Sequence, residues 1–179
     1  MSELTKDSGV RKRLIDAGLK ELLEHGPDDF SLRRVASMAQ VSCATPYRHF
    51  KDKDELVRAV ISQIRENWIL LTQEIKGIFQ GGTKELVTEL SVAAVRFWIA
   101  GDNFAPFLSL GELSEFDTPV IEAIGEYCEN SSLEDVKRGD IETSVLALVY
   151  GAVTLILSKR CESDVAVKTL RSQINRVLS

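Results

Sequence analysis

Hydrophobic residues recur about every three to four positions along this chain, and this spacing places them on one face of a helix in nearly every segment. Alternation of apolar and polar residues, which would indicate β-strands, is nowhere sustained long enough to predict a sheet. A first helix is predicted from about Ser8 to His25. Gly26 and Pro27 should end it, because glycine caps helix C-termini and proline cannot continue a helix. The pattern predicts an all-α fold.

The segment 31–53 predicts two short helices joined by a tight turn. Ser31 is a natural N-cap for the first, because its hydroxyl can accept a hydrogen bond from a backbone N–H two or three residues later. Ser42 is expected to cap the second, and Pro46 should lie within its first turn, where the missing N–H costs little. This layout is typical of a helix-turn-helix, whose second helix enters the major groove of DNA.

A long helix is predicted from its N-cap, Asp52, to about Phe79, and its length would let it link a small head to a larger body. Further helices are expected at about 84–100, at 104–112, from Thr118-Pro119 onward, at 140–159 and at 163–178. We therefore expect two domains, a three-helix helix-turn-helix head over residues 1–52 and a larger C-terminal helical body over residues 53–179.

Charge is distributed unevenly along the chain, whose net charge is −5. Residues 1–53 hold ten Lys and Arg against eight Asp and Glu, whereas residues 54–179 hold twelve against nineteen. Within 31–53 there are five basic residues and one acidic residue. A positive patch on an acidic body would attract phosphates at one face only, although an ordinary solvated helix face would account for the charge as well.

Several classes of protein are disfavoured by what the sequence lacks. Its three cysteines and two histidines have spacings that fit neither a disulfide framework nor a zinc site, so we expect a cytoplasmic protein without metal or other cofactor. No Gly-rich phosphate loop or nucleophile elbow is present, so we expect no catalytic residue and no enzyme. The longest apolar run, 145–157, is shorter than the ~20 residues that span a bilayer, which predicts a buried helix and no membrane partner.

Two motifs carry a resemblance to a known family. The segment from Ala39 reads AQVSxxTxYxHF, KxxL follows from Lys53, and the first helix reads LIDAGLKELLEHG from Leu14. Together they resemble the TetR family of bacterial transcriptional regulators over about residues 10–60, while the rest matches only in length and helix rhythm. The resemblance implies an all-helical homodimer. Its heads would bind a double-stranded DNA operator, and a small-molecule effector bound in the body would release repression.

The resemblance also implies roles for individual residues. Family members place base-contacting side chains where this chain has Cys43, Ala44 and Tyr47, and small apolar side chains suit contact with a thymine methyl group. The other positions imply phosphate contacts, which orient a head without reading sequence. The expected DNA-binding residues are Arg33, Ser42, Cys43, Ala44, Thr45, Tyr47, Arg48, His49 and Lys53. Alternatively, Tyr47 and His49 could pack within the head, and the Cys43 thiol could act as a redox switch, although no resolving cysteine is near in sequence.

Three positions depart from the family pattern. Gln40 stands where the family usually has glycine in the turn, which predicts a mildly strained positive φ. Pro46 replaces an aliphatic residue and could shift the start of the recognition helix. Gly18 replaces alanine, at a cost of about 1 kcal/mol in helix propensity.

The body is rich in aromatic residues, about half of which we expect to be plain core packing, while the others could line an enclosed apolar cavity. Arg96 could pair with an anionic ligand, whereas Glu112 and Glu115 would suit a cationic one, and the sequence does not choose between them. The expected ligand-binding residues are Trp68, Arg96, Phe97, Phe107, Tyr127 and Tyr150.

Apolar stripes on the last two predicted helices suggest how the chain could dimerise. The stripes consist of Ile141, Val145, Leu148, Ala152, Leu155 and Ile156, and of Val167, Leu170, Ile174 and Val177. They could pack internally. We favour a four-helix dimer interface, with Gly151 and Ala152 allowing close approach, because a two-fold dimer presents two recognition helices to a two-fold operator.

The function predicted from these features is a ligand-responsive transcriptional repressor that binds a palindromic operator as a homodimer. Two alternatives stand beside it. One is a helical protein–protein adaptor whose DNA head is non-functional, against which the basic patch argues. The other is an activator, or a regulator without a small-molecule ligand.

Overall fold

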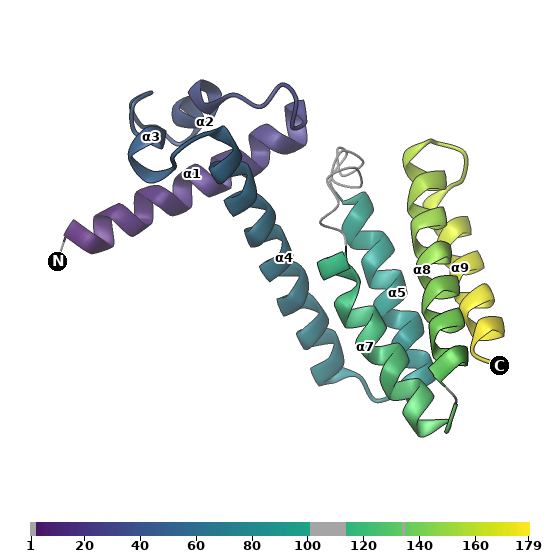
Figure 1. The fold of residues 1–179 in the computed structure, drawn as a ribbon. Coiled ribbons are helices and arrows are strands. Elements are labelled where there is room, and N and C mark those ends of the chain that lie inside the picture. Colours follow the sequence, from purple (N-terminus) through teal and green to yellow (C-terminus); the bar gives the residue numbers. More distant parts are fainter. Residues whose placement is uncertain (1–2, 101–113, 134) are drawn as a thin grey trace. The chain divides into compact units, whose positions relative to one another are not determined.

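The computed structural model describes residues 3–100, 114–133 and 135–179, and within these ranges the regular structure is entirely helical, which confirms the all-α fold. The predicted helix at 104–112, with Phe107 and Glu112, lies outside the described residues. The helices, labelled in Figure 1, are α1 (Glu3–His25), α2 (Leu32–Met38), α3 (Pro46–His49), α4 (Lys53–Ile78), α5 (Thr83–Ile99), α7 (Ser114–Asn130), α8 (Asp135–Leu157) and α9 (Ser163–Val177).

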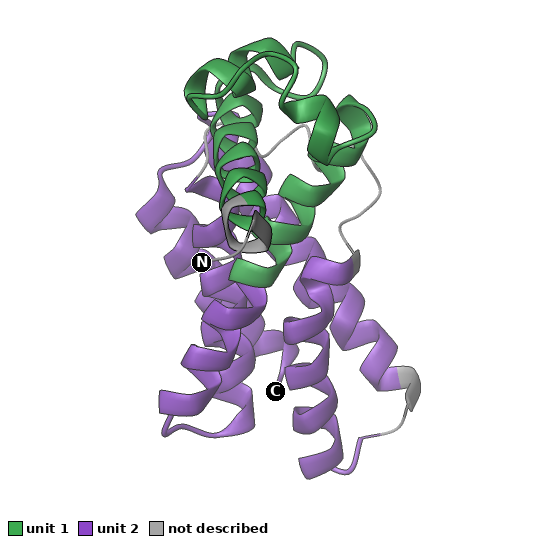
Figure 2. Cartoon of the chain, turned by 90° about the vertical axis from the view of Figure 1, so that its left-hand side faces the viewer, with its two compact units in different colours: residues 1–67 green, residues 68–179 purple. Residues whose placement is uncertain are grey.

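The chain divides into two compact units, residues 1–67 and 68–179, shown in two colours in Figure 2. The division falls within α4, whose first half contacts α1 at Gly18 and whose second half belongs to the larger unit. We call the smaller unit the head and the larger one the body.

The head has an apolar core of its own, to which α1, α2, the loop before α2 and the first half of α4 contribute. Its most buried members include Leu14, Leu22, Phe30, Val35, Phe50, Leu56 and Val60. Gly18 lies where α1 meets α4, and a Cβ added there would stand 2.9 Å from Val60 Cγ2. The glycine therefore permits close approach of the two helices, which sets a packing benefit against its expected cost in helix propensity.

Local signals set most of the helix ends in the head. Ser31 caps α2 as predicted, because its hydroxyl accepts a hydrogen bond from the backbone N–H of Arg34 at 3.4 Å. Gln40 adopts the positive φ expected of it, 56°. Asp52 caps α4 by accepting from the Glu55 N–H at 2.8 Å.

The prediction that Ser42 caps the recognition helix is wrong. Residues 42–45 form a turn closed by a hydrogen bond from the Thr45 N–H to the Ser42 carbonyl at 2.9 Å, and α3 begins only at Pro46. Proline suits the first helical position because its fixed φ is already helical and its missing N–H would have no partner there. The Ser42 hydroxyl lies 2.8 Å from that of Thr45. The recognition helix is consequently short, and Cys43 and Ala44 lie in the turn before it.

In the body, α5 packs against α7, α8 and α9, and α8 packs against α7 and α9. The prediction that a helix starts at Thr118-Pro119 is wrong, because α7 already begins at Ser114 and contains Pro119. The N–H that this proline lacks would have bonded the carbonyl of Glu115, an exposed residue near the helix start. The next carbonyl, that of Phe116, accepts a hydrogen bond from the indole N–H of Trp68 at 2.8 Å and so joins α7 to α4.

Helix α8 is apolar on nearly all sides, and its stretch 137–157 is long and apolar enough, by length and composition alone, to cross a membrane. A core helix passes the same test, but only 28% of the stretch is buried inside this chain. The helix predicted to be buried is therefore buried on one face only. That face carries Val145 and Val149, whereas the face that carries Ala147 and Gly151 is exposed.

The two apolar stripes expected to form a dimer interface are packed largely within the chain. Their buried members are Ile141, Val145, Ala152, Leu170 and Ile174. Leu155 is 43% exposed, and Leu148, Ile156, Val167 and Val177 are partly exposed. Periodicity had identified the faces that are buried, but α5 and α7 cover more of them than we expected.

Candidate nucleic-acid interface

One side of the short helix α3 is exposed to water, and its other side is buried. Pro46 and Phe50 are buried, whereas Arg48 is exposed and the ring of Tyr47 is 63% exposed. The Tyr47 side chain therefore does not pack in the head, which removes that alternative. Ser42, Cys43 and Ala44, in the preceding turn, are exposed as well.

His49 differs from its neighbours because its side chain turns toward the start of α1. Its Nε2 lies 3.5 Å from Asp7 Oδ1, and only 9% of the side chain is exposed. The guanidinium of Arg11 sits 5.0 Å from the centre of the Phe50 ring, an arrangement that favours a cation–π interaction. The first half of α1 is thus tied to the end of α3 by two contacts.

Sequence reasoning missed the network that joins α1 to α2. Glu21 is fully buried, and its Oε1 accepts hydrogen bonds from the Ser31 N–H at 2.9 Å and from Arg34 Nε at 2.7 Å. The hydrogen bond with Glu21 raises the pKa of Arg34 above its ordinary value. His25 Nδ1 lies 3.4 Å from the other oxygen, Oε2, which has no hydrogen-bond partner. The signal was available, because Glu21 stands on the apolar face of α1 directly before Leu22.

The remaining expected contacts of the head lie at helix starts. Arg33 is exposed in the first turn of α2, beside Arg34. The Lys53 ammonium donates to the carbonyl of Asp28 at 3.4 Å, a long hydrogen bond. The capping box at α4 is a variant, since Glu55 accepts from the Lys51 N–H at 2.6 Å.

In the body, the structure brings two of the expected ligand residues together. The rings of Trp68 and Phe97 lie 5.0 Å apart, and Phe97 also neighbours the rings of Trp98 and Phe116. Trp68 is 1% exposed, so this aromatic group is a packed core.

Two other expected ligand residues are hydrogen-bonded within the protein. The Tyr127 hydroxyl donates to the Leu178 carbonyl at 2.7 Å, which anchors the end of the chain. The Tyr150 hydroxyl donates to Asp117 Oδ1 at 2.6 Å. Burial raises the pKa of both partners, although the hydrogen bond from Tyr150 works in the opposite direction on Asp117.

Arg96 borders an open groove of about 590 Å³ between the second half of α4 and α5. The groove is lined mainly by apolar side chains, and sequence reasoning did not foresee it. Its lining residues are Leu71, Ile75, Ile78, Phe79, Gln80, Glu89, Val92, Ala93 and Arg96. Among the described residues, no three His, Cys, Asp or Glu side chains gather as a metal site would require.

A comparison with known families identifies the head. The model for bacterial regulatory proteins of the tetR family matches residues 14–60, from α1 into α4. The head, from α1 into α4, is therefore similar to the DNA-binding part of TetR-family regulators.

Curated relatives include HTH-type transcriptional regulators. The HTH-type transcriptional regulator YvkB of Bacillus subtilis is 35% identical over 68 residues, which cover 38% of this chain and 36% of that protein. The HTH-type transcriptional regulator BetI of Escherichia coli is 30% identical over 113 residues, which cover 56% of this chain and 57% of that protein. The matches thus span about a third to just over half of the length of these relatives.

The likeness of fold extends over nearly the whole chain. The transcriptional regulator FadR from Bacillus subtilis, solved in complex with stearoyl-CoA, superposes with a TM-score of 0.72 at 16% identity. The superposition covers 94% of this chain and 97% of FadR. The body therefore shares the fold of the corresponding part of FadR, although the two sequences have diverged.

Proposed function

We propose that the chain is a cytoplasmic transcriptional repressor that binds a palindromic operator as a homodimer and leaves it when a small molecule binds. Residues 1–52 would form the DNA-binding domain and residues 53–179 the ligand-binding and dimerisation domain, with no catalytic role and no cofactor. The observation that carries the proposal is the exposure of Tyr47 beside Arg48, on a helix whose other side is packed. In a TetR-family head, a polar aromatic ring held in water is suited to contact DNA.

The nine expected DNA contacts remain our proposal for the interface. Tyr47 and Arg48 would reach from α3, with Thr45 at its N-cap. Cys43 and Ala44 would approach from the preceding turn, where small exposed side chains could contact a thymine methyl group. The others would contribute phosphate contacts, and they are Arg33, Ser42, His49 and Lys53. His49 would first have to turn away from Asp7.

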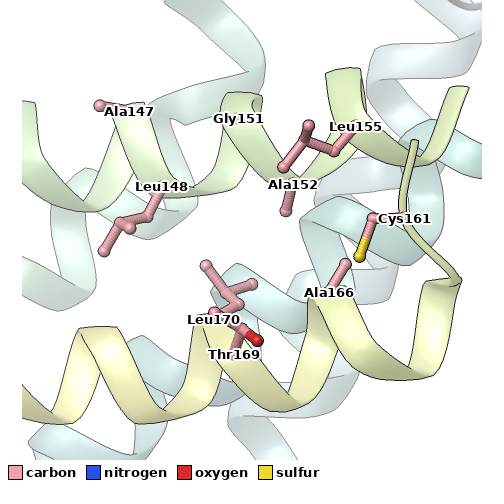
Figure 3. A pocket seen from close by; sticks show the side chains of 9 residues that line it. All are labelled: Ala147, Leu148, Gly151, Ala152, Leu155, Cys161, Ala166, Thr169 and Leu170. Carbon is pink, nitrogen blue, oxygen red and sulfur yellow. The ribbon is translucent and has the colours of Figure 1, made fainter. Parts of the chain in front are cut away.

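The proposed homodimer rests on the uncovered side of α8 and α9. A groove of about 200 Å³ runs between these helices, and Figure 3 shows side chains from both pointing into it. It is lined by small and apolar residues, namely Ala147, Leu148, Gly151, Ala152, Leu155, Cys161, Ala166, Thr169 and Leu170. Val165 on α9 is exposed nearby in sequence. A second copy could cover this face closely because Ala147 and Gly151 project little.

The proposed effector is supported by the fold of the body. FadR was solved with stearoyl-CoA, so one protein of this fold takes a small molecule. By extension, we propose that the body of this chain binds its effector with the ligand-binding residues expected from the sequence. They are Trp68, Arg96, Phe97, Phe107, Tyr127 and Tyr150.

Two experiments test the proposal. The purified protein first selects fragments of genomic DNA, and the enriched fragment is then titrated by fluorescence anisotropy at several salt concentrations. We expect one enriched palindrome, bound by two chains, with half-sites about one helical turn apart and a steep salt dependence. Tyr47→Ala should weaken binding, and Lys168→Ala, an exposed change on α9, should not. The adaptor alternative replaces the repressor if three results coincide. No fragment is enriched, binding is weak at every salt concentration, and mass spectrometry detects no co-purified effector.

A further inference from the structure

The groove between α4 and α5 exposes more apolar surface than ordinary solvated helices do. Ile78 is 78% exposed, and Leu71 is also exposed. Both line the groove, together with Ile75 and Phe79 from the same helix. Contiguous exposed apolar side chains in a concave surface are typical of a binding site.

The charged residues of the groove leave one positive group without a hydrogen-bonded partner. Arg171 from α9 bonds both carboxylate oxygens of Glu89, with Nη1 on Oε1 and Nη2 on Oε2 at 2.9 Å. These bonds, together with the nearby charge of Arg96, hold the pKa of Glu89 below its ordinary value. Arg96 is exposed and makes no hydrogen bond or ion pair within the part of the chain that the structure describes. Two guanidinium groups therefore face one carboxylate, which leaves a net positive charge beside the apolar groove.

The arrangement of the helices separates that charge from the far end of the groove. A short connection joins α4 to α5, so the two helices run antiparallel (Figure 1). The 5.0 Å contact between the rings of Trp68 and Phe97 places Arg96 near the level of residue 69, at the Leu71 end of the groove. Phe79 lies at the opposite end, about 12 Å from Leu71 at 1.5 Å per residue of helix. This is the length of an extended medium-chain fatty acid.

We propose that this groove binds an anionic amphiphile of medium chain length, with its acid group on Arg96 and its hydrocarbon tail along the apolar residues of α4. A carboxylate would receive a charge-assisted hydrogen bond from the guanidinium, and the tail would remove Leu71, Ile75 and Ile78 from water. This proposal gives the chemical class of the ligand that the body would bind. An effect of that ligand on DNA binding rests on the proposed function, whereas binding of the ligand to the groove does not.

Isothermal titration with laurate, below its micellar concentration, tests the site on the full chain. We expect saturable binding of laurate and weaker binding of butyrate, which lacks the tail. Dodecyltrimethylammonium, with the same tail and the opposite charge, should bind at least about tenfold more weakly because Arg96 would repel it. Equal binding of the two charged probes would overturn the proposal.

Two variants test the residues separately. Arg96→Gln should weaken laurate binding about tenfold or more, whereas Arg176→Gln, an exposed arginine near the end of α9, should leave it unchanged. Ile78→Gln should weaken laurate but not change the weak binding of butyrate. Unchanged laurate affinity in Arg96→Gln, with a native circular dichroism spectrum, would overturn the assignment. A change of oligomeric state in Ile78→Gln without a change in laurate binding would do so as well, and would identify a second copy as the occupant.

The two proposals can fail independently. If laurate binds through Arg96 but leaves operator affinity unchanged, the site stands and effector release through it is wrong. If the operator is bound specifically but laurate does not bind, the DNA-binding function stands and the groove proposal is wrong.

Discussion

Glu21, buried on α1, accepts a hydrogen bond from the backbone N–H of Ser31, the N-cap of α2, at 2.9 Å. A single carboxylate thus fixes where the second helix begins relative to the first. The same oxygen holds Arg34, one turn into α2. The start of α2 is therefore held by a buried group of α1.

Replacing Glu21 should destabilise the head. Glu21→Ala leaves the part-buried Ser31 N–H without its partner and releases Arg34, and we expect a loss of about 2–4 kcal/mol in the free energy of unfolding. Urea denaturation followed by circular dichroism measures it. Glu24→Ala, at an exposed position of the same helix, should change stability by less than about 0.5 kcal/mol. Equal effects of the two changes would show that the network contributes nothing.

Arg48 is exposed on α3 and should act on DNA without affecting the fold. Arg48→Ala should lower affinity for specific and unrelated DNA by similar factors and reduce the salt slope by about one, as expected when a phosphate contact is lost. Anisotropy titrations at four or more salt concentrations measure both quantities. Operator affinity unchanged at every salt concentration would show that Arg48 does not face the backbone of DNA.

Gly18 and Val60 should behave as a coupled pair, because a Cβ at residue 18 would lie 2.9 Å from Val60 Cγ2. Gly18→Ala should cost about 1–3 kcal/mol of stability, despite the better helix propensity of alanine. Gly139→Ala, in α8 where nothing lies within 4 Å, should instead stabilise by about 0.5–1 kcal/mol. In a double-mutant cycle, Val60→Ala should relieve much of the cost of Gly18→Ala, and strict additivity would contradict the contact.

The pair of Glu89 and Arg171 should make stability depend on acid pH. Its hydrogen bonds lower the pKa of Glu89 from an ordinary value of 4.5, so the folded state binds the proton less tightly than the unfolded state. The stabilisation is present above pH 4.5 and is lost as the pH falls through the lowered pKa. Thermal melts of the protein and of Glu89→Gln should differ at pH 7 and converge as the pH falls below 4.5 and through the lowered pKa of Glu89. A difference that does not change with pH would show that the pair does not contribute through its charge.

Local signals were sufficient for much of the head. Ser31, Gln40 and Asp52 do what their residue types predict, because capping and a positive φ depend on a few neighbouring backbone groups. Pro46 was recognised as unusual, but the turn at residues 42–45 moved the start of α3 past Ser42. A hydrogen-bonded turn and a helical first turn differ too little in local preference for the sequence to separate them.

Hydrophobic periodicity by itself determined that the chain is helical and identified most of the buried helix faces, and the head motif indicated the family that the head resembles. Only the tertiary structure decided which element covers each face. It placed Val60 against Gly18, gave Glu21 its partners on α2, and buried Leu170 and Ile174 within the chain. It also left Leu71 and Ile78 uncovered beside Arg96. The physical reason is that apolar burial is non-directional, so a stripe of hydrophobic residues specifies that it will be covered but not by what.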